Sequence, residues 1–142
     1  MKHKMNRFGT TTLVCIMLFA SGIANAKETF DGSSNFVCAA ISVIGCLDVA
    51  TCKKGEARTF DLPEFMTIDF KKKIVHASYD DGTTEVESPI KTLEKNNTQL
   101  ILQGVEDGHG WSMAIHRENG RMSLAVVGEE LSYTMFGACT AL

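Results

Sequence analysis

The chain has 142 residues and a formal net charge of −3, and hydrophobic residues make up 44% of it. This length is suited to one domain with a single hydrophobic core. The acidic balance argues against binding to nucleic acid or to an anionic membrane surface, because both favour a basic patch.

The first residues have the layout of an export signal. Three basic residues among the first seven precede an apolar run from Leu13 to Ala20, and small residues follow up to Ala26. The run is shorter than the ~20 apolar residues that cross a bilayer, so residues 1–26 are predicted to be a cleaved signal peptide. The remaining 116 residues carry 11 basic and 17 acidic side chains, a net charge of −6. We therefore expect a periplasmic or secreted protein without a membrane anchor.

Four cysteines follow the predicted signal peptide, namely Cys38, Cys46, Cys52 and Cys139. In an exported chain an even number of cysteines indicates disulfides, and four thiols allow three pairings. Cys46 and Cys52 would close a short loop at little entropic cost, and the other two would then join the start of the domain to its end. A metal site is the weaker interpretation, because zinc ligands usually occur at Cys-x-x-Cys spacing and this chain has none. No metal or other cofactor is expected.

The chain then divides into a leader and a series of short strands. Residues 27–35 are polar and rich in Gly and Ser, which predicts a flexible leader. The nearly continuous apolar run Phe36–Ile44, rich in β-branched residues, predicts a buried strand, with a helix as the alternative. Farther along, alternate residues are apolar, as in half-buried strands. The apolar faces are Met66, Ile68 and Phe70; Val75, Ala77 and Tyr79; Leu100 to Leu102; Trp111, Met113 and Ile115; Met122, Leu124 and Val126; and Leu131, Tyr133 and Met135.

Turn signals separate these strands. Gly after Asp or Asn favours a tight hairpin because it accepts the positive φ that such turns require. Pro89 divides two weaker strand candidates, 84–87 and 90–94, since proline cannot donate to a ladder. Gly104 is expected to end the strand that contains Leu100. The predicted turns are 80–82, 96–97, 106–108, 118–120 and 128–130.

Seven to nine short strands with regularly spaced turns predict an all-β antiparallel meander. A meander of this size closes into a barrel or folds into a β-sandwich. We favour the barrel because closure removes exposed strand edges, and a Cys38–Cys139 disulfide would hold the first strand beside the last. Residues 36–142 are thus predicted to form one disulfide-stapled β domain. No feature of the sequence indicates an oligomeric state.

The candidate binding residues are Glu106, Asp107, His109 and Trp111, all in one Gly-rich segment. The segment would form either a flexible loop that presents His109, or a hairpin in which Trp111 is simply the largest core side chain. No residues have the spacing of metal ligands, most carboxylates occur at turns, and no serine has the context of a nucleophile. The sequence therefore predicts no catalytic residues and favours a binding protein over an enzyme.

Three groups of residues resemble those of small exported proteobacterial proteins of unknown function. They are Leu62-Pro63 with Phe65 and Ile68-Asp69, Gln103-Gly104 to Gly110-Trp111-Ser112, and Phe136-Gly137-Ala138-Cys139. The resemblance covers most of the chain after residue 26 and implies no functional residues, because none of these motifs has an assigned chemistry. In size and β pattern the domain is also similar to the small barrel inhibitors that Gram-negative bacteria export against lysozymes and proteases, a likeness of fold alone.

Four functions are compatible with such a scaffold, one of them a structural or envelope-stress role without a defined ligand. The first is a non-enzymatic binding module that uses a loop end or open barrel mouth, with a basic protein such as a lysozyme as the favoured partner. The second is a carrier of a small apolar ligand in a barrel cavity, lined by residues such as Trp111, Met113, Met122 and Met135. The third is a hydrolase, which would need His and carboxylate side chains in one cleft. A void of several hundred Å3 would distinguish a carrier from a filled barrel.

Overall fold

The computed structural model describes residues 30–48, 51–79 and 85–142. The predicted signal peptide, residues 27–29 of the predicted leader and the predicted turn at 80–82 lie outside these ranges. Within them, no helix is long and apolar enough to cross a membrane.

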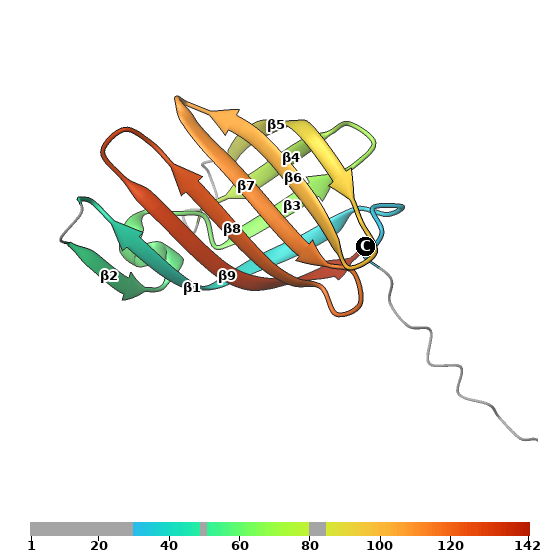
Figure 1. Ribbon diagram of the computed structural model, residues 1–142, viewed down its shortest axis with the longest axis horizontal. Helices are drawn as coiled ribbons and strands as arrows, with labels where there is room; N and C mark the ends of the chain where they lie inside the picture. Colours follow the sequence, from blue (N-terminus) through green and yellow to red (C-terminus); the bar gives the residue numbers. More distant parts are fainter. Residues whose placement is uncertain (1–29, 49–50, 80–84) are drawn as a thin grey trace, which may run out of the picture.

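The described part of the chain contains nine strands and one short helical turn (Figure 1). They are β1 (Phe36–Cys46), β2 (Cys52–Gly55), the 3-10 helix η1 (Ala57–Phe60), β3 (Phe65–Asp69), β4 (Ile74–Ser78), β5 (Glu85–Lys95), β6 (Gln99–Glu106), β7 (His109–His116), β8 (Arg121–Val127) and β9 (Ser132–Ala141). The apolar run Phe36–Ile44 therefore forms a strand, as predicted, and not a helix.

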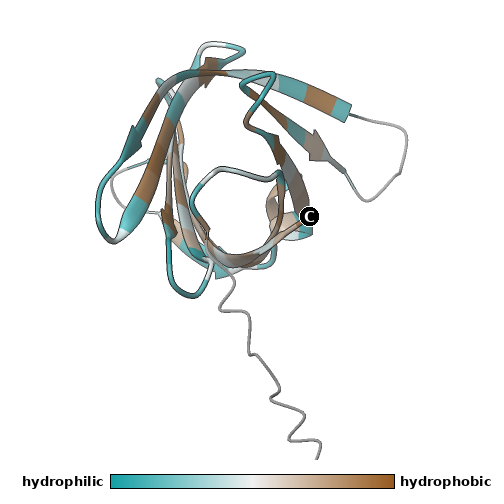
Figure 2. Ribbon diagram, turned by 90° about the vertical axis from the view of Figure 1, so that its right-hand side faces the viewer, coloured by the Kyte–Doolittle hydropathy of each residue, from teal (hydrophilic) through white to brown (hydrophobic). Residues whose placement is uncertain are grey.

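The strands close into a barrel. Strands β3 to β9 pair in chain order, β1 pairs with β3 on one side, and β9 returns to pair with β1 over ten residue pairs. Seen end-on, the strands surround a common interior (Figure 2). Strand β2 lies outside this eight-stranded ring and pairs only with the second half of β1. The predicted antiparallel barrel is confirmed, and the alternative of a β-sandwich is not what forms.

Both disulfides join residues that are direct partners in the strand ladder. Cys38 of β1 lies opposite Cys139 of β9, with 3.9 Å between their Cα atoms. Cys46 of β1 lies opposite Cys52 of β2, with 4.1 Å between the Cα atoms. The predicted pairing is confirmed among the three that four thiols allow. The Cys38–Cys139 bond is buried at the seam where the barrel closes.

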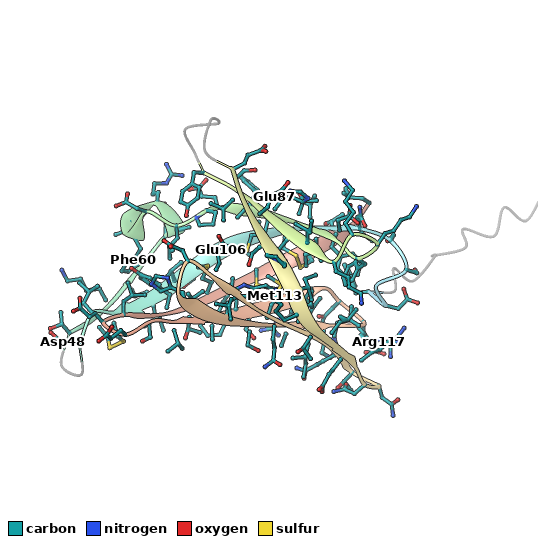
Figure 3. All side chains as sticks on the ribbon, turned by 90° about the horizontal axis from the view of Figure 1, so that it is seen from above. Asp48, Phe60, Glu87, Glu106, Met113 and Arg117 are labelled. Carbon is teal, nitrogen blue, oxygen red and sulfur yellow. A yellow bond between two sulfur atoms is a disulfide. The ribbon has the colours of Figure 1, made fainter. Side chains whose placement is uncertain are left out.

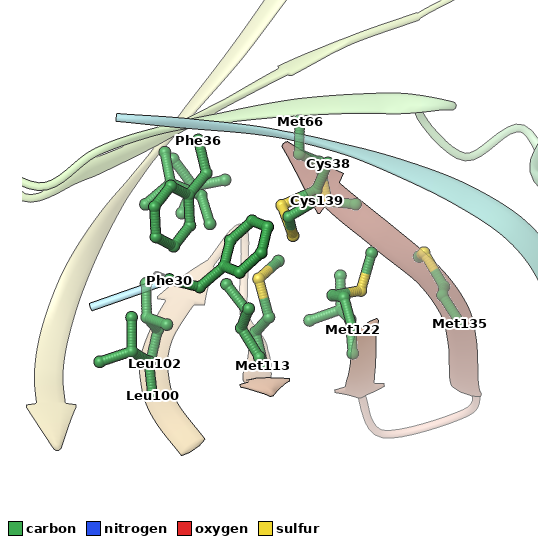
Figure 4. Close-up of a cluster of buried hydrophobic side chains, with 14 of the residues drawn as sticks. Phe30, Phe36, Cys38, Met66, Leu100, Leu102, Met113, Met122, Met135 and Cys139 are labelled. Atoms are coloured by element: carbon green, nitrogen blue, oxygen red, sulfur yellow. A yellow bond between two sulfur atoms is a disulfide. The ribbon is translucent and has the colours of Figure 1, made fainter. Parts of the chain in front are cut away.

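The alternating apolar faces predicted from the sequence point into the barrel. Along β3, β6, β7 and β8 the buried residues are spaced two positions apart. Burial of each large apolar side chain contributes about 1.5–3 kcal/mol, so these faces are the main stabilising feature of the fold. The buried members include Met66, Ile68, Leu100, Leu102, Met113, Ile115, Met122, Leu124 and Met135, most of which are labelled in Figure 4.

The segment before β1 closes one end of the barrel, which corrects the prediction of a loose leader for its described residues. Phe30 is only 3% exposed, and its backbone N–H donates to the carbonyl of Arg117 at 3.1 Å. Its ring packs edge-on against Phe36, with centroids 5.3 Å apart, and Phe36 packs in the same way against Phe70 at 4.8 Å. Figure 4 shows Phe30 and Phe36 in the interior. Phe30, an isolated aromatic residue in a polar segment, thus closes this end of the barrel, and we call it the Phe30 plug.

Strand β5 runs through Pro89 without a break, which corrects the prediction of two strands. The first half of β5 pairs with β4, and only residues from Ile90 onward pair with β6. The N–H of Ile90 donates to the carbonyl of Lys73 on the β4 side at 2.8 Å. Because successive N–H groups of a strand point to opposite sides, the nitrogen of Pro89 faces β6 before that ladder begins. No ladder hydrogen bond is lost there.

Candidate functional site

A cavity of about 600 Å3 occupies the end of the barrel opposite the Phe30 plug. In Figure 3, Phe60 and Glu106 lie toward the end that carries Asp48, Met113 lies near the middle, and Arg117 lies at the other end. Twenty residues line the cavity: Phe60, Asp61, Leu62, Pro63, Met66, Val75, Ala77, Tyr79, Val86, Ser88, Glu106, Asp107, His109, Trp111, Met113, Leu124, Val126, Leu131, Tyr133 and Met135. Most of these side chains are apolar. The barrel thus encloses an apolar cavity at this end, whereas aromatic side chains pack the end near Phe30.

Methionines make up the inner part of the cavity. Met66, Met113 and Met135 line it and also belong to the buried core. Because methionine is unbranched and flexible, such a surface adapts readily to different apolar shapes. Met122, which was also expected to line a cavity, is buried in the core but does not line this one.

Trp111 spans one wall of the cavity. Its indole N–H donates to the hydroxyl oxygen of Ser88 at 2.8 Å, which joins β7 to β5 across the intervening strand β6. Strand β6 continues past Gly104 to Glu106, so the prediction that it ends at Gly104 is wrong. Gly104 lies directly opposite Trp111 of β7. A Cβ at Gly104 would overlap the indole ring and would lie 2.6 Å from the carbonyl oxygen of Pro89. Because glycine has no Cβ, residue 104 leaves room for the indole ring in the cavity wall.

Gly104→Ala is expected to displace Trp111 and break its hydrogen bond to Ser88. Forcing an extra methyl group into a packed site destabilises a protein by about 1–3 kcal/mol. Urea unfolding would measure the loss, and the emission spectrum of Trp111 would report the displaced ring. Gly110→Ala is the matched control on the neighbouring strand, because nothing lies within 4 Å of a Cβ there. Equal stability losses in the two variants would contradict this account.

Aromatic side chains from two other elements stand at the outer part of the cavity. Phe60, the last residue of η1, packs edge-on against Tyr133 of β9 with ring centroids 5.8 Å apart. Gly45 makes this contact possible, since a Cβ there would lie 2.7 Å from Phe60 and 2.9 Å from Tyr133. The helix η1 ends at Phe60, and the following residue, Asp61, has a φ of 52° that turns the chain.

Tyr79 is held in its neutral form. Burial raises the pKa of its phenol above the ordinary value of 10.0, and the nearby Asp61 carboxylate raises it further. The phenol is therefore uncharged at neutral pH and offers an O–H donor beside an otherwise apolar wall.

The β6–β7 turn forms another part of the mouth. Asp107 and Gly108 have φ values of 45° and 76°, as a two-residue hairpin requires. The Nδ1–H of His109 donates to the carbonyl of Asp107 at 2.8 Å, because a carbonyl can only accept. The imidazole lies against Gly128 of the β8–β9 connection, where a Cβ would be 2.5 Å from the ring. The segment therefore forms a tight two-residue hairpin between β6 and β7.

The structure brings all four candidate binding residues to this one cavity. Glu106, Asp107, His109 and Trp111 line it together with residues that the sequence did not single out. Alternation within strands identifies the inward faces, which accounts for Ala77, Tyr79 and Tyr133. No local signal marks Ser88 or Phe60, because both reach the cavity through contacts between distant strands.

In the described ranges, no group of three or more His, Cys, Asp or Glu side chains could hold a metal ion. The polar groups that line the cavity are carboxylates, hydroxyls and the ring nitrogens of His109 and Trp111. Comparison with known proteins found no matching family model, no matching curated protein and no matching solved structure.

Proposed function

We propose that the protein binds a small apolar ligand in the cavity at the open end of the barrel. The observation that carries the proposal is the cavity itself. Its volume of about 600 Å3 falls within the range of small-molecule sites, about 300–1,000 Å3. An apolar lining with a few convergent polar groups is also typical of such sites.

The two ends of the barrel differ in how closely their side chains pack. Near Phe30 the inward-facing apolar residues are closely packed, with three aromatic rings in edge-on contact. At the other end, small side chains such as Val75, Ala77 and Val86 line the wall and leave space. A ligand with a matching apolar surface would gain about 25 cal/mol for each Å2 removed from water.

We further propose that the protein acts outside the cytoplasm, as a periplasmic or secreted carrier. Two disulfides support this location, because such bonds persist in oxidising compartments. The pattern of residues 1–26 supports it independently. We also propose that the protein is related to the small exported proteobacterial proteins that its sequence resembles.

Fluorescence titration with N-phenylnaphthylamine, an uncharged apolar fluorophore, tests ligand binding. Trp111 is the only tryptophan of the chain and it lines the cavity. Energy transfer from the indole to the probe therefore reports that the probe is bound to the barrel. We expect saturable binding of one probe per protein molecule. Probe fluorescence that rises without saturation, or without loss of Trp111 emission, would contradict the proposal.

A basic protein such as a lysozyme is a second candidate partner. The carboxylates of Glu106 and Asp107 at the mouth favour it by charge complementarity. Such a partner would cover the open end without entering the cavity. Inhibition of lysozyme activity by the purified protein would measure this function. A substitution that fills the cavity with a larger side chain would leave the inhibition unchanged.

A further inference from the structure

We infer that the ligand is an amphipathic cation, an amine or quaternary ammonium whose apolar part enters the barrel while its charged end stays at the mouth. This inference rests on the proposed function and specifies the class of ligand. It follows from the charges, the aromatic rings and the hydrogen-bond donors of the cavity.

The charges of the lining have one sign. Asp61, Glu106 and Asp107 line the cavity, and neither Lys nor Arg does so among the residues that the structure describes. The three carboxylates come from two separate turns, the end of η1 and the β6–β7 hairpin. An apolar cavity thus opens through a rim that attracts cations and repels anions.

Among the residues that the structure describes, these carboxylates also have no cationic side chain as a partner. Elsewhere, Asp31 lies 3.8 Å from Lys95, Glu64 lies 2.9 Å from Arg58, and Asp69 lies 3.9 Å from Lys72. In the described ranges, no Lys, Arg or His lies within ion-pair distance of the three carboxylates at the cavity. Asp61 and Asp107 are exposed and Glu106 is half-buried. A bound cation would supply the partner that these carboxylates lack among the described residues, in an interaction that salt screens.

Aromatic rings give a second, independent reason for a cation. Phe60, Tyr79, Trp111 and Tyr133 all line the cavity. The face of an aromatic ring attracts a cation within about 6 Å, and tryptophan does so most strongly. Together with the carboxylates, these rings match an alkylammonium head better than an uncharged one.

The hydrogen-bond donors argue against an anion. The indole N–H of Trp111 is used by Ser88, and the Nδ1–H of His109 is used by the Asp107 carbonyl. A carboxylate or phosphate head would therefore meet three like charges without a Lys or Arg partner in the described lining. Among the neutral side chains of the described lining, the hydroxyls of Ser88, Tyr79 and Tyr133 could still donate to it.

Three ligands with the same eight-carbon chain separate charge from apolar contact: octyltrimethylammonium, octanol and octanoate. Competition against N-phenylnaphthylamine would give their affinities. We expect octyltrimethylammonium to bind at least about tenfold more tightly than octanol, and octanoate to bind more weakly than octanol. The advantage of the cation should shrink as salt is added.

The double variant Glu106→Gln and Asp107→Asn is expected to bring the affinity for octyltrimethylammonium close to that for octanol, while octanol itself binds as before. The matched control is Glu129→Gln with Glu130→Gln, two exposed residues of the β8–β9 turn that do not line the cavity. The control should keep the preference for the cation.

The outcomes distinguish the two proposals. Absence of binding by the neutral fluorophore and by all three octyl compounds would overturn the proposed function. Binding of octanol and octanoate at least as tight as that of octyltrimethylammonium would overturn the cation inference and leave the apolar site standing. An equal loss of cation preference in the control would also overturn it, because general acidity of the surface would then explain the result.

Discussion

Replacement of both Cys38 and Cys139 by Ala is expected to lower the free energy of unfolding by about 5 kcal/mol. The two residues are 101 positions apart in the sequence. A crosslink over a loop of this length restricts the unfolded chain by about 4.7 kcal/mol in the loop-entropy model. The bond is also buried within the core, so its removal leaves space that the neighbouring side chains fill only in part.

The Cys46→Ala and Cys52→Ala variant provides the comparison. These residues are six positions apart and join β1 to β2, outside the closed ring. A loop this short corresponds to about 2 kcal/mol by the same relation. Urea unfolding of both variants beside the parent protein would measure the difference. A larger loss from the short loop than from the long one would contradict the role assigned to the seam.

Ala77→Phe is expected to weaken binding of N-phenylnaphthylamine by roughly a hundredfold. Ala77 of β4 lines the cavity, so a phenyl ring at this position would occupy space that the ligand needs. If about 100 Å2 of ligand surface is no longer buried, the loss at about 25 cal/mol per Å2 corresponds to that factor. Titration monitored through Trp111 emission would measure the change.

Ala125→Phe is the matched control. It makes the same substitution at an exposed position of β8, next to Val126, which faces the cavity. Alternation along the strand directs residue 125 to the outside. The control should bind the probe with unchanged affinity. Equal weakening in both variants would show that the probe binds elsewhere or that the added ring acts through stability.

Much of the fold could be predicted because local pattern and global structure agree. The alternation of apolar residues around Met113, Ile115 and Leu124 requires one buried face, and the Asn-Gly turn that ends at Gly120 joins two such strands. The pairing of cysteines followed from the short separation of Cys46 and Cys52. These features depend on neighbouring residues, which is why the sequence alone indicates them.

The features that could not be predicted depend on contacts between distant segments. Periodicity does not distinguish a barrel from a sandwich, because both have one buried face on each strand. Pro89 is tolerated because the two ladders of β5 change over at that point. Phe30 closes the barrel although its own segment is polar, since its binding partners come from β1 and the β7–β8 turn.

The candidate site shows the same limit. Met113 and Met122 both face inward, yet only Met113 lines the cavity. The two methionines lie at different positions along the barrel axis, because neighbouring strands are shifted relative to one another. The sequence of one strand does not show this shift. The sequence therefore indicated the mouth through Glu106 to Trp111 but not how deep the hollow extends.

Nuclear magnetic resonance of isotope-labelled methionine methyl groups would test the central claim most directly. Met66, Met113 and Met135 line the cavity, whereas Met122 is buried in the core outside it and serves as an internal control. On addition of N-phenylnaphthylamine we expect the resonances of the first three methyl groups to shift, with little change at Met122. Saturating probe that shifts none of the three cavity methyl groups would contradict a ligand-binding cavity in this barrel.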